Sequence, residues 1–144
     1  MTEPTLEERI LTEFRTVAVV GVSTDPFKDS YRVAKYLINH GYHVIPVNPQ
    51  TKQLLGRSCY PDLSSIPEPV EVVDVFRSPD KVMPIVEEAI KVKAKAVWMQ
   101  EGIVNEEAAA RARAAGLLVV MDHCMRREHI RQVRKLDPDA LEVE

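Results

Sequence analysis

Residues 16–23, with the sequence TVAVVGVS, decide the fold that the rest of the chain must adopt. The first five of these residues are mostly β-branched and apolar, which is typical of a strand covered on both faces. A short polar loop then leads into the helical pattern that contains Arg32 and Val33. Amide groups at the start of a helix have no partner within the helix and carry partial positive charge. A strand, a tight loop and a helix start therefore predict a site for phosphate oxygens.

Four further apolar runs rich in Val and Ile follow, and amphipathic stretches separate them. The predicted strands are residues 16–20, 44–47, 70–76, 96–99 and 117–121. The predicted helices are residues 5–14, 33–40, 79–92, 105–115 and 126–135. Strands that alternate with helices indicate right-handed crossovers and a parallel sheet. We therefore expect a Rossmann-like, doubly wound α/β domain with helices on both faces and a ligand at the carboxyl ends of the strands.

Local signals mark several element ends. Ser78 and Asn105 are predicted N-caps, because a side-chain oxygen at that position accepts a hydrogen bond from a helix amide. Gly41 and Gly116 stand just past two predicted helices, where a left-handed residue ends a helix. A short edge strand is expected near residues 59–60.

Length and charge limit the classes of protein. A chain of 144 residues that is 45% hydrophobic can bury one substantial core. We expect a single domain over residues 1–144, with its core at about 5–136 and an acidic tail at 137–144. The net charge of -3 argues against a nucleic-acid partner, because such binding needs a concentrated basic face.

Membrane contact and a disulfide framework are not expected either. No apolar run approaches the roughly 20 residues that span a bilayer, and the acidic start of the chain is unlike a secretory signal. We therefore expect a cytoplasmic protein. Cys59 and Cys124 lack the paired spacing of a zinc site and are too few for a disulfide framework, so we expect two free thiols and no metal.

The loop after the first strand departs from the pattern of dinucleotide-binding enzymes. Those enzymes carry three glycines in the loop and a carboxylate at the end of the second strand. Here Gly21 is the only glycine of the loop, and Lys52 follows the second strand. A lysine suits a phosphorylated ribose, but the ribose phosphates of NADP and coenzyme A are both dianions. The residues alone leave both ligands open.

Five segments of the chain carry a resemblance to a known family. They are VAVVGVSTDPFKDSYRV, VIPVNPQTKQLLG, VDVFRSP, WMQEGIVNEEA and VVMDHCMRREH. In this order and spacing the chain resembles the small stand-alone CoA-binding proteins. It is more distantly similar to the CoA-binding N-terminal domain of the succinyl-CoA synthetase alpha subunit. The resemblance implies that the chain binds coenzyme A or an acyl-CoA.

The resemblance also implies which residues contact that ligand. The implied contacts are Gly21, Val22, Ser23, Thr24 and Asp25 at the diphosphate, Asn48, Pro49 and Lys52 at the ribose phosphate, Val75, Phe76 and Arg77 at the rim of the adenine pocket, and Met99, Gln100 and Glu101 beside the pantetheine arm. Arg32, one turn into the helix, is either a further contact of the phosphates or a solvated surface charge. Phe76 fits a core position equally well. A buried Glu101 is expected to hold neighbouring loops together.

The run Asp122-His123-Cys124 invites a nucleophile hypothesis. Adjacent residues of an extended segment point to opposite faces, so packing is the favoured role and a contact with the pantetheine arm is the alternative. A thiol near that arm also raises the hypothesis of a mixed disulfide between CoA and Cys124 or Cys59. His129 is expected on the solvated, basic face of the last helix, and Trp98 in the core.

The sequence contains no nucleophile elbow, P-loop or other full catalytic pattern. We therefore expect a CoA-binding protein and not an enzyme. One alternative is the CoA-binding subunit of a multi-chain acyl-CoA ligase, which implies a protein partner. This alternative arises because succinyl-CoA synthetase also needs a second alpha domain and a beta subunit. The other alternative is an NADP-dependent reductase.

Overall fold

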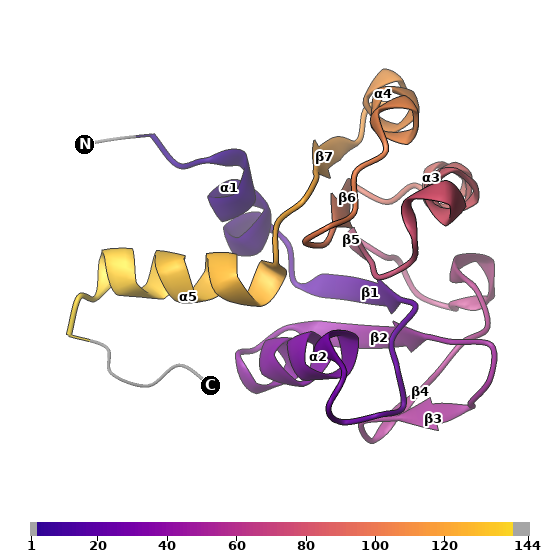
Figure 1. Cartoon of the computed structure of the whole chain (residues 1–144), viewed down its shortest axis with the longest axis horizontal. Helices are drawn as coiled ribbons and strands as arrows, with labels where there is room; N and C mark the ends of the chain where they lie inside the picture. Colours follow the sequence, from indigo (N-terminus) through magenta and orange to yellow (C-terminus); the bar gives the residue numbers. More distant parts are fainter. Residues whose placement is uncertain (1–2, 140–144) are drawn as a thin grey trace.

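The computed structural model describes residues 3–139 and has the expected doubly wound α/β architecture (Figure 1). Its strands are β1 (Thr16–Val20), β2 (His43–Val47), β5 (Val72–Val75), β6 (Ala96–Met99) and β7 (Leu118–Val120). They form one parallel sheet in the order β2-β1-β5-β6-β7. The direction of strand addition therefore reverses between β1 and β5. The predicted strand 70–76 is shorter in the structure.

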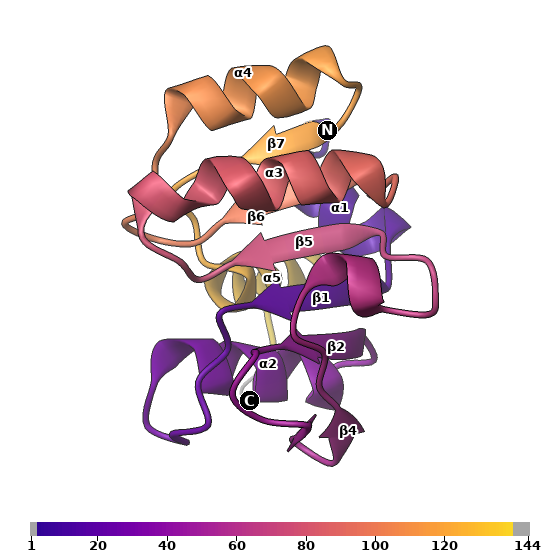
Figure 2. The same cartoon turned by 90° about the vertical axis from the view of Figure 1, so that its right-hand side faces the viewer.

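Helices cover both faces of this sheet (Figures 1 and 2). One face carries α1 (Leu6–Glu13), α2 (Asp29–Asn39) and α5 (Met125–Leu136), and the other carries α3 (Val82–Lys91) and α4 (Glu106–Ala114). Each face has its own hydrophobic core. In β1, Val17 and Val19 face the first core, whereas Ala18 and Val20 face the second. This two-sided burial is the reason that the strands appear as continuous apolar runs in the sequence.

Three predicted helix ends are confirmed. The side chain of Asn105 caps α4, since its Oδ1 accepts a hydrogen bond from the amide of Ala108 at 2.9 Å. Gly41 and Gly116 lie just past α2 and α4, each with φ of +91°. A left-handed glycine at this position lets the next amide bond back to a free helix carbonyl.

Ser78 stands at the predicted N-cap position, directly ahead of Pro79, but its side chain makes no capping hydrogen bond. Its hydroxyl donates to Oδ1 of Asp80 at 2.6 Å and accepts no hydrogen bond from a helix amide. The segment η2 (Pro79–Lys81) is a 3-10 turn, and α3 begins only after it. The Ser78 side chain therefore stabilises a local turn and does not cap a helix amide.

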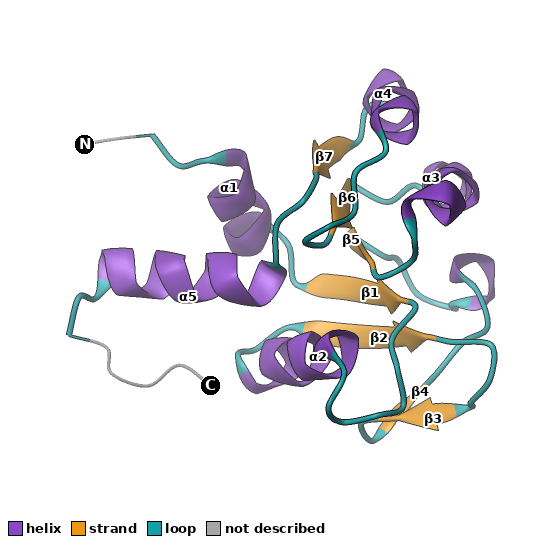
Figure 3. Cartoon of the chain, in the orientation of Figure 1, coloured by secondary structure: helices purple, strands orange, loops and turns teal. Residues whose placement is uncertain are grey.

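A small hairpin stands beside the edge strand β2 (Figure 3). It consists of β3 (Gln53–Leu54) and β4 (Arg57–Ser58), which pair antiparallel. The edge strand expected near residues 59–60 is found slightly earlier, and Tyr60 makes only a single parallel bridge with Val47. The short 3-10 helix η1 (Leu63–Ser65) follows before the chain enters β5.

His129 is not on the solvated face of α5, contrary to the expectation. Its Nδ1 lies 2.7 Å from the hydroxyl of Tyr36, and its ring packs edge-on against Tyr36 and Tyr42. This contact exists because α5 packs against α2.

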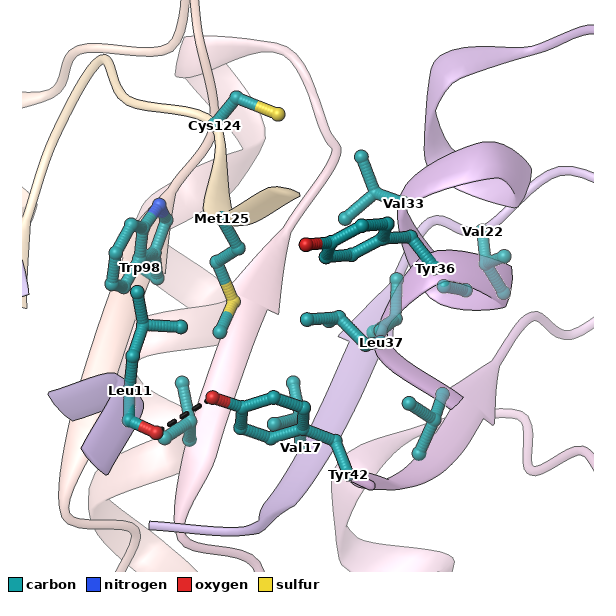
Figure 4. Close-up of a cluster of buried hydrophobic side chains, with 14 of the residues drawn as sticks. Leu11, Val17, Val22, Val33, Tyr36, Leu37, Tyr42, Trp98, Cys124 and Met125 are labelled. Atoms are coloured by element: carbon teal, nitrogen blue, oxygen red, sulfur yellow. Dashed lines mark hydrogen bonds between the residues drawn. The ribbon is translucent and has the colours of Figure 1, made fainter. Parts of the chain in front are cut away.

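Trp98 is fully buried, as expected. Figure 4 shows this core, where the hydroxyl of Tyr42 donates to the carbonyl of Leu11 at 2.6 Å.

The helix α5 ends at Leu136, close to the predicted start of the acidic tail. Residues 140–144 of that tail lie outside the described residues. Within residues 3–139, no helix is long and apolar enough to cross a membrane.

Candidate functional site

Two cavities open at the carboxyl end of the sheet, around the point where the strand order reverses. Cleft A has a volume of about 710 Å³ and is lined by residues 20–24, 47–50 and 61–62, by Arg77, and by Asp80, Lys81, Pro84, Ile85 and Glu88. Cleft B has a volume of about 510 Å³ and is lined by Asp29, Arg32, Val33, residues 76–79, residues 100–103, Cys124, Arg126 and Arg127. Arg77 borders both clefts. Ligands of doubly wound proteins bind at this position of the sheet.

Gly21 places the loop after β1 directly against the end of β5. Its φ is +88°, and a Cβ atom at this position would lie 2.6 Å from the carbonyl oxygen of Phe76. The same atom would lie 2.8 Å from Cδ of Arg77. A backbone carbonyl cannot move aside as a flexible side chain can, so only glycine fits here. The loop therefore reaches the border between the two clefts.

The loop after β1 keeps two amides open. The amides of Ser23 and Asp25 donate to side-chain oxygens within the loop and α2, at 2.8 Å and 3.0 Å. The amide of Gly21 donates to the carbonyl of Val47 at 3.1 Å. Among the described residues, the amides of Val22 and Thr24 donate no hydrogen bond. These two donors are available to an anion at the mouth of cleft A.

Asn48 ties the loops after β1 and β2 together. Its Nδ2 donates to the carbonyl of Val22 at 2.8 Å, and its Oδ1 accepts from the amide of Gln50 at 2.7 Å. Asn48 and Pro49 both line cleft A. Lys52 is exposed and lines neither cleft A nor cleft B.

Lys81 is a cation of cleft A that the sequence analysis missed. It stands just before α3, in the turn that follows the Arg77-Ser78 segment at the end of β5. Its proximity to the loops after β1 and β2 depends on the sheet order. The sequence signal was its place shortly after a predicted strand end, which by itself is weak.

The walls of cleft A combine apolar and polar residues, and its carboxylates already have partners. Pro49, Pro61, Pro84 and Ile85 line it. The Glu88 carboxylate accepts from the amides of residues 63 and 64 at 3.2 Å and 3.1 Å. The apolar residues of this wall can pack against a flat heteroaromatic base.

Three carboxylates of the site are held by neighbouring donors. Oδ1 of Asp62 accepts from the amide of Ser65 at 2.8 Å. The hydrogen bond from Ser78 lowers the pKa of Asp80. Glu101, at the edge of cleft B, is exposed and not buried as expected, and it forms an ion pair with Arg127 at 2.9 Å. Glu101 therefore links the loop after β6 to α5 from the surface and does not join two loops.

The buried polar residue of this strand end is Gln100. Its Oε1 accepts from the amide of Met125 at 3.1 Å and so fixes the start of α5 against β6.

Phe76 is half-buried: it packs on the core and also lines cleft B. Val75 and Met99 are fully buried in the core, and their side chains line neither cleft.

The two cysteines are free thiols, as expected, but they lie in different surroundings. Cys124 occupies the N-cap position of α5 and lines cleft B, opposite Val33 of α2 (Figure 4). Cys59 lines neither cleft, and its Sγ lies 3.6 Å from the carbonyl of Asn48. Burial raises the pKa of the Cys59 thiol. His123 is exposed and directs its carbonyl to Nε1 of Trp98 at 2.8 Å.

The chain is thus a doubly wound α/β protein with two clefts at the reversal point of its sheet. Within residues 3–139, no group of three or more His, Cys, Asp or Glu side chains could hold a metal ion. The profile of the CoA binding domain family matches residues 15–130. The chain belongs to this family.

Relatives of two kinds are similar to the chain. The uncharacterized protein YneT of Bacillus subtilis (strain 168) is 36% identical over 122 residues, which cover 85% of this chain and 90% of YneT. The structure of a hypothetical protein from Pyrococcus horikoshii OT3 is 46% identical, with a TM-score of 0.84 and coverage of 91% and 96% of the two chains. Both are stand-alone chains of similar length.

The second kind of relative is a larger enzyme. The apo form of the dinucleotide forming acetyl-coenzyme A synthetase 1 of Ca. Korarchaeum cryptofilum is 31% identical, with a TM-score of 0.67. The match covers 74% of this chain but only 26% of the synthetase chain. The chain therefore corresponds to about one quarter of that enzyme.

Proposed function

We propose that this protein binds coenzyme A or an acyl-CoA across both clefts. In this proposal the adenosine lies in cleft A, the diphosphate lies at the loop after β1, and the pantetheine arm extends into cleft B. The main support for this proposal is the position of Gly21. It places the loop whose Val22 and Thr24 amides donate no hydrogen bond at the border of the two clefts. CoA is a long ligand with a diphosphate near its middle, a phosphorylated adenosine at one end and a neutral pantetheine arm at the other, which matches this arrangement.

The local chemistry supports each part of this placement. The proline-rich wall of cleft A suits a base, and the amides of Val22 and Thr24 suit phosphate oxygens. Arg77, at the border, adds positive charge next to the diphosphate. Membership of the CoA binding domain family supports the choice of CoA over NADP.

We further propose a binding role, as a sensor, carrier or accessory subunit in the cytoplasm, without catalysis by this chain. The support is that the polar side chains of the site hold loops in place. Asn48, Gln100 and Glu101 each bond to a neighbouring segment of the chain. These three side chains therefore serve the architecture of the site.

Calorimetric titration with CoA, 3'-dephospho-CoA and NADP tests the proposal. We expect CoA to bind, and to bind markedly more weakly once the 3'-phosphate is removed. A preference for NADP, or no binding of CoA at all, would overturn it. A crystal structure with CoA in which the loop after β1 contacts no phosphate would overturn the placement.

The position of the 3'-phosphate is tested by two lysine substitutions. If the exposed Lys52 holds the 3'-phosphate, Lys52→Ala will weaken CoA binding by about 1 to 3 kcal/mol and leave 3'-dephospho-CoA nearly unaffected, as for a charge-assisted contact. If Lys81 holds it, Lys81→Ala will show this selective loss instead, since Lys81 lines cleft A and Lys52 does not. Equal losses for both ligands in the Lys52 variant would assign the 3'-phosphate elsewhere. A selective loss in the Lys81 variant alone would assign it to Lys81.

The second candidate function is that of a CoA-binding subunit in a multi-chain acyl-CoA ligase. The similarity to one quarter of an acetyl-coenzyme A synthetase chain favours it. It predicts that the tagged chain co-purifies with a polypeptide that carries an ATP-grasp-like or phosphohistidine domain. Purification of a monomeric chain that binds CoA tightly alone, with no such polypeptide, argues for the stand-alone role.

A further inference from the structure

A further cavity, groove C, follows one face of α2. Its volume is about 600 Å³. It is lined by Pro26 and Phe27 in the loop after β1, by residues 31–32, 35–36 and 39 of α2, and by Arg126 at the start of α5. Arg32 and Arg126 also line cleft B, so the two cavities adjoin. The proposed function assigns no group of CoA to groove C.

Groove C combines aromatic rings with positive charge. Phe27 is 88% exposed, and Tyr31 is half-buried. Three cations line the groove, namely Arg32, Lys35 and Arg126, and no carboxylate is among its described lining residues. Within residues 3–139, neither Arg32 nor Lys35 forms an ion pair. An occupant that carries both carboxylates and apolar side chains therefore complements this groove.

The segment of this chain that follows α5 has such a composition. Residues 137–144 have the sequence DPDALEVE, with four carboxylates and no lysine or arginine. Leu141 and Val143 alternate with Glu142 and Glu144. Alternate side chains of an extended segment point to opposite sides, so an apolar pair and an acidic pair can face different walls of a groove.

The described residues after α5 start this segment on the side of α2. The helix α5 ends at Leu136, and the amide of Asp139 donates to Oδ1 of Asp137 at 3.2 Å, which closes a turn directly after the helix. Figure 1 shows that the chain turns after α5 toward the side of α2. The two helices also pack against each other. The turn therefore directs the chain toward the helix that carries groove C.

The segment is long enough to reach the cations of groove C. Arg126 precedes Leu136 by ten residues, which corresponds to about 15 Å along α5. The Arg126 guanidinium lies 5.7 Å from the centroid of the Tyr36 ring, so α2 passes α5 at this level. Lys35 is the neighbour of Tyr36, and Arg32 stands one turn before it in α2. Residues 137–144 span about 26 Å when extended, which covers this path.

We propose that residues 137–144 bind in groove C of the same chain. In this proposal the carboxylates of the segment pair with Lys35 and Arg32, whereas its apolar side chains pack on the aromatic rings. Because the segment is tethered, its effective concentration at the groove is on the order of millimolar, so weak surface contacts suffice.

The proposal has a consequence for the ligand site, which rests on the proposed function. Arg32 lines both groove C and cleft B. A segment that holds Arg32 in groove C keeps this cation away from the diphosphate of CoA. The segment is then an internal anionic competitor that lowers the affinity for CoA.

Carbodiimide cross-linking of the full chain tests the placement. The reagent activates a carboxylate, which then forms an amide with a nearby lysine amine, and mass spectrometry of the digest identifies the pair. We expect a product between Lys35 and Glu142 or Glu144. The Lys135–Glu8 ion pair, at 3.3 Å, is the internal positive control. Formation of the control product without any Lys35 product would overturn the proposal.

Two further controls assign the product to groove C of the same chain. In a mixture of unlabelled and 15N-labelled protein, both cross-linked peptides should carry the same label; mixed products would place the segment on a second copy and overturn the proposal. Phe27→Ala should lower the yield several-fold, whereas Val104→Ala, at another exposed apolar residue, should not. An unchanged yield in Phe27→Ala would assign the segment to another surface.

The effect on affinity is measured by calorimetry with CoA at low ionic strength. The double variant Glu142→Gln/Glu144→Gln should bind CoA about threefold more tightly, as expected for release of an exposed ion pair. The same change in an Arg32→Gln background should have no effect. Glu106→Gln/Glu107→Gln, at the start of α4, removes the same charge elsewhere and is the matched control.

The outcomes separate this inference from the proposed function. If the Lys35 product forms but both double variants bind CoA equally, the coupling through Arg32 is wrong and the placement in groove C stands. If CoA does not bind at all, the proposed function and the coupling fail. The cross-link needs no CoA, so it decides the placement of the segment in either case.

Discussion

Asp74 lies in the middle of β5, and both of its carboxyl oxygens are buried without a hydrogen-bond partner among the described residues. Its neighbours in the sheet register are Val19 and Trp98, which belong to the apolar core on the face of α1, α2 and α5. Burial raises the pKa of Asp74 well above its usual range. The side chain is therefore held as the neutral acid, because an isolated charge at this position would be very costly.

This burial predicts a specific dependence of stability on pH. Because the pKa of Asp74 is higher in the folded than in the unfolded state, the folded state binds more protons above about pH 4. The free energy of unfolding should then fall as pH rises from that value through the folded-state pKa. The Asn side chain of Asp74→Asn is neutral at every pH. The melting temperature of this variant, relative to that of the wild type, should therefore increase as pH rises. Thermal denaturation across a pH series checks this, with the exposed Asp139→Asn as control; a constant difference contradicts it.

Gly21 and Gly41 form a matched pair for testing the close approach of the loop to β5. Both have positive φ, but a Cβ at Gly21 meets the carbonyl of Phe76 at 2.6 Å, whereas a Cβ at Gly41 meets nothing within 4 Å. Both alanine variants should lose more than about 1 kcal/mol of unfolding free energy from backbone strain. Gly21→Ala should lose more, and it alone should weaken CoA binding. Denaturant unfolding and calorimetry measure both effects; equal behaviour of the two variants would argue against the role of Gly21.

At the scale of elements, Asn105 connects α4 to the turn before α3. Its Oδ1 accepts from the amide of Ala108 at 2.9 Å, and its Nδ2 donates to the carbonyl of Pro79 at 2.9 Å. Asn105→Ala should lower the free energy of unfolding by about 1 to 2 kcal/mol, since it removes an N-cap and a link between elements. Asn105→Asp keeps the cap oxygen and loses only the donor, so it should cost less. Urea unfolding of both variants tests this order, which fails if the aspartate variant is the less stable one.

At the scale of the whole molecule, the sheet order brings Cys124 to the end of the proposed ligand and leaves Cys59 beside the second strand. If the arm of CoA lies in cleft B, the Cys124 thiolate can attack the disulfide of oxidised CoA. The products are a Cys124–CoA mixed disulfide and one released CoA thiol. Intact mass after incubation with oxidised CoA should show one adduct in the wild type and in Cys59→Ser. The absence of an adduct in the wild type, or its persistence in Cys124→Ser, would exclude this geometry.

The parts of the fold that the sequence predicted are those set by local physics. Burial on both faces makes a parallel strand apolar throughout. The five strands of the sheet could therefore be predicted from runs of apolar residues in the sequence. The cap at Asn105 and the turn at Gly41 involve bonds within a few residues, and they were predicted for that reason. The missing side-chain cap at Ser78 and the unexpected exposure of Glu101 concern polar side chains with several available partners. His129 was misplaced because its partner, Tyr36, is 93 residues away.

By itself, the sequence determined the α/β class and membership of a CoA-binding family, and it predicted that the loop after the first strand receives phosphate. Only the tertiary structure decided the walls of the site. It placed Lys81 and not Lys52 in cleft A, and it placed Cys124 and the arginines of α5 in cleft B. The reason is physical: backbone preferences act over a few residues, whereas a cavity is formed by segments that meet only after the strands have taken their order in the sheet.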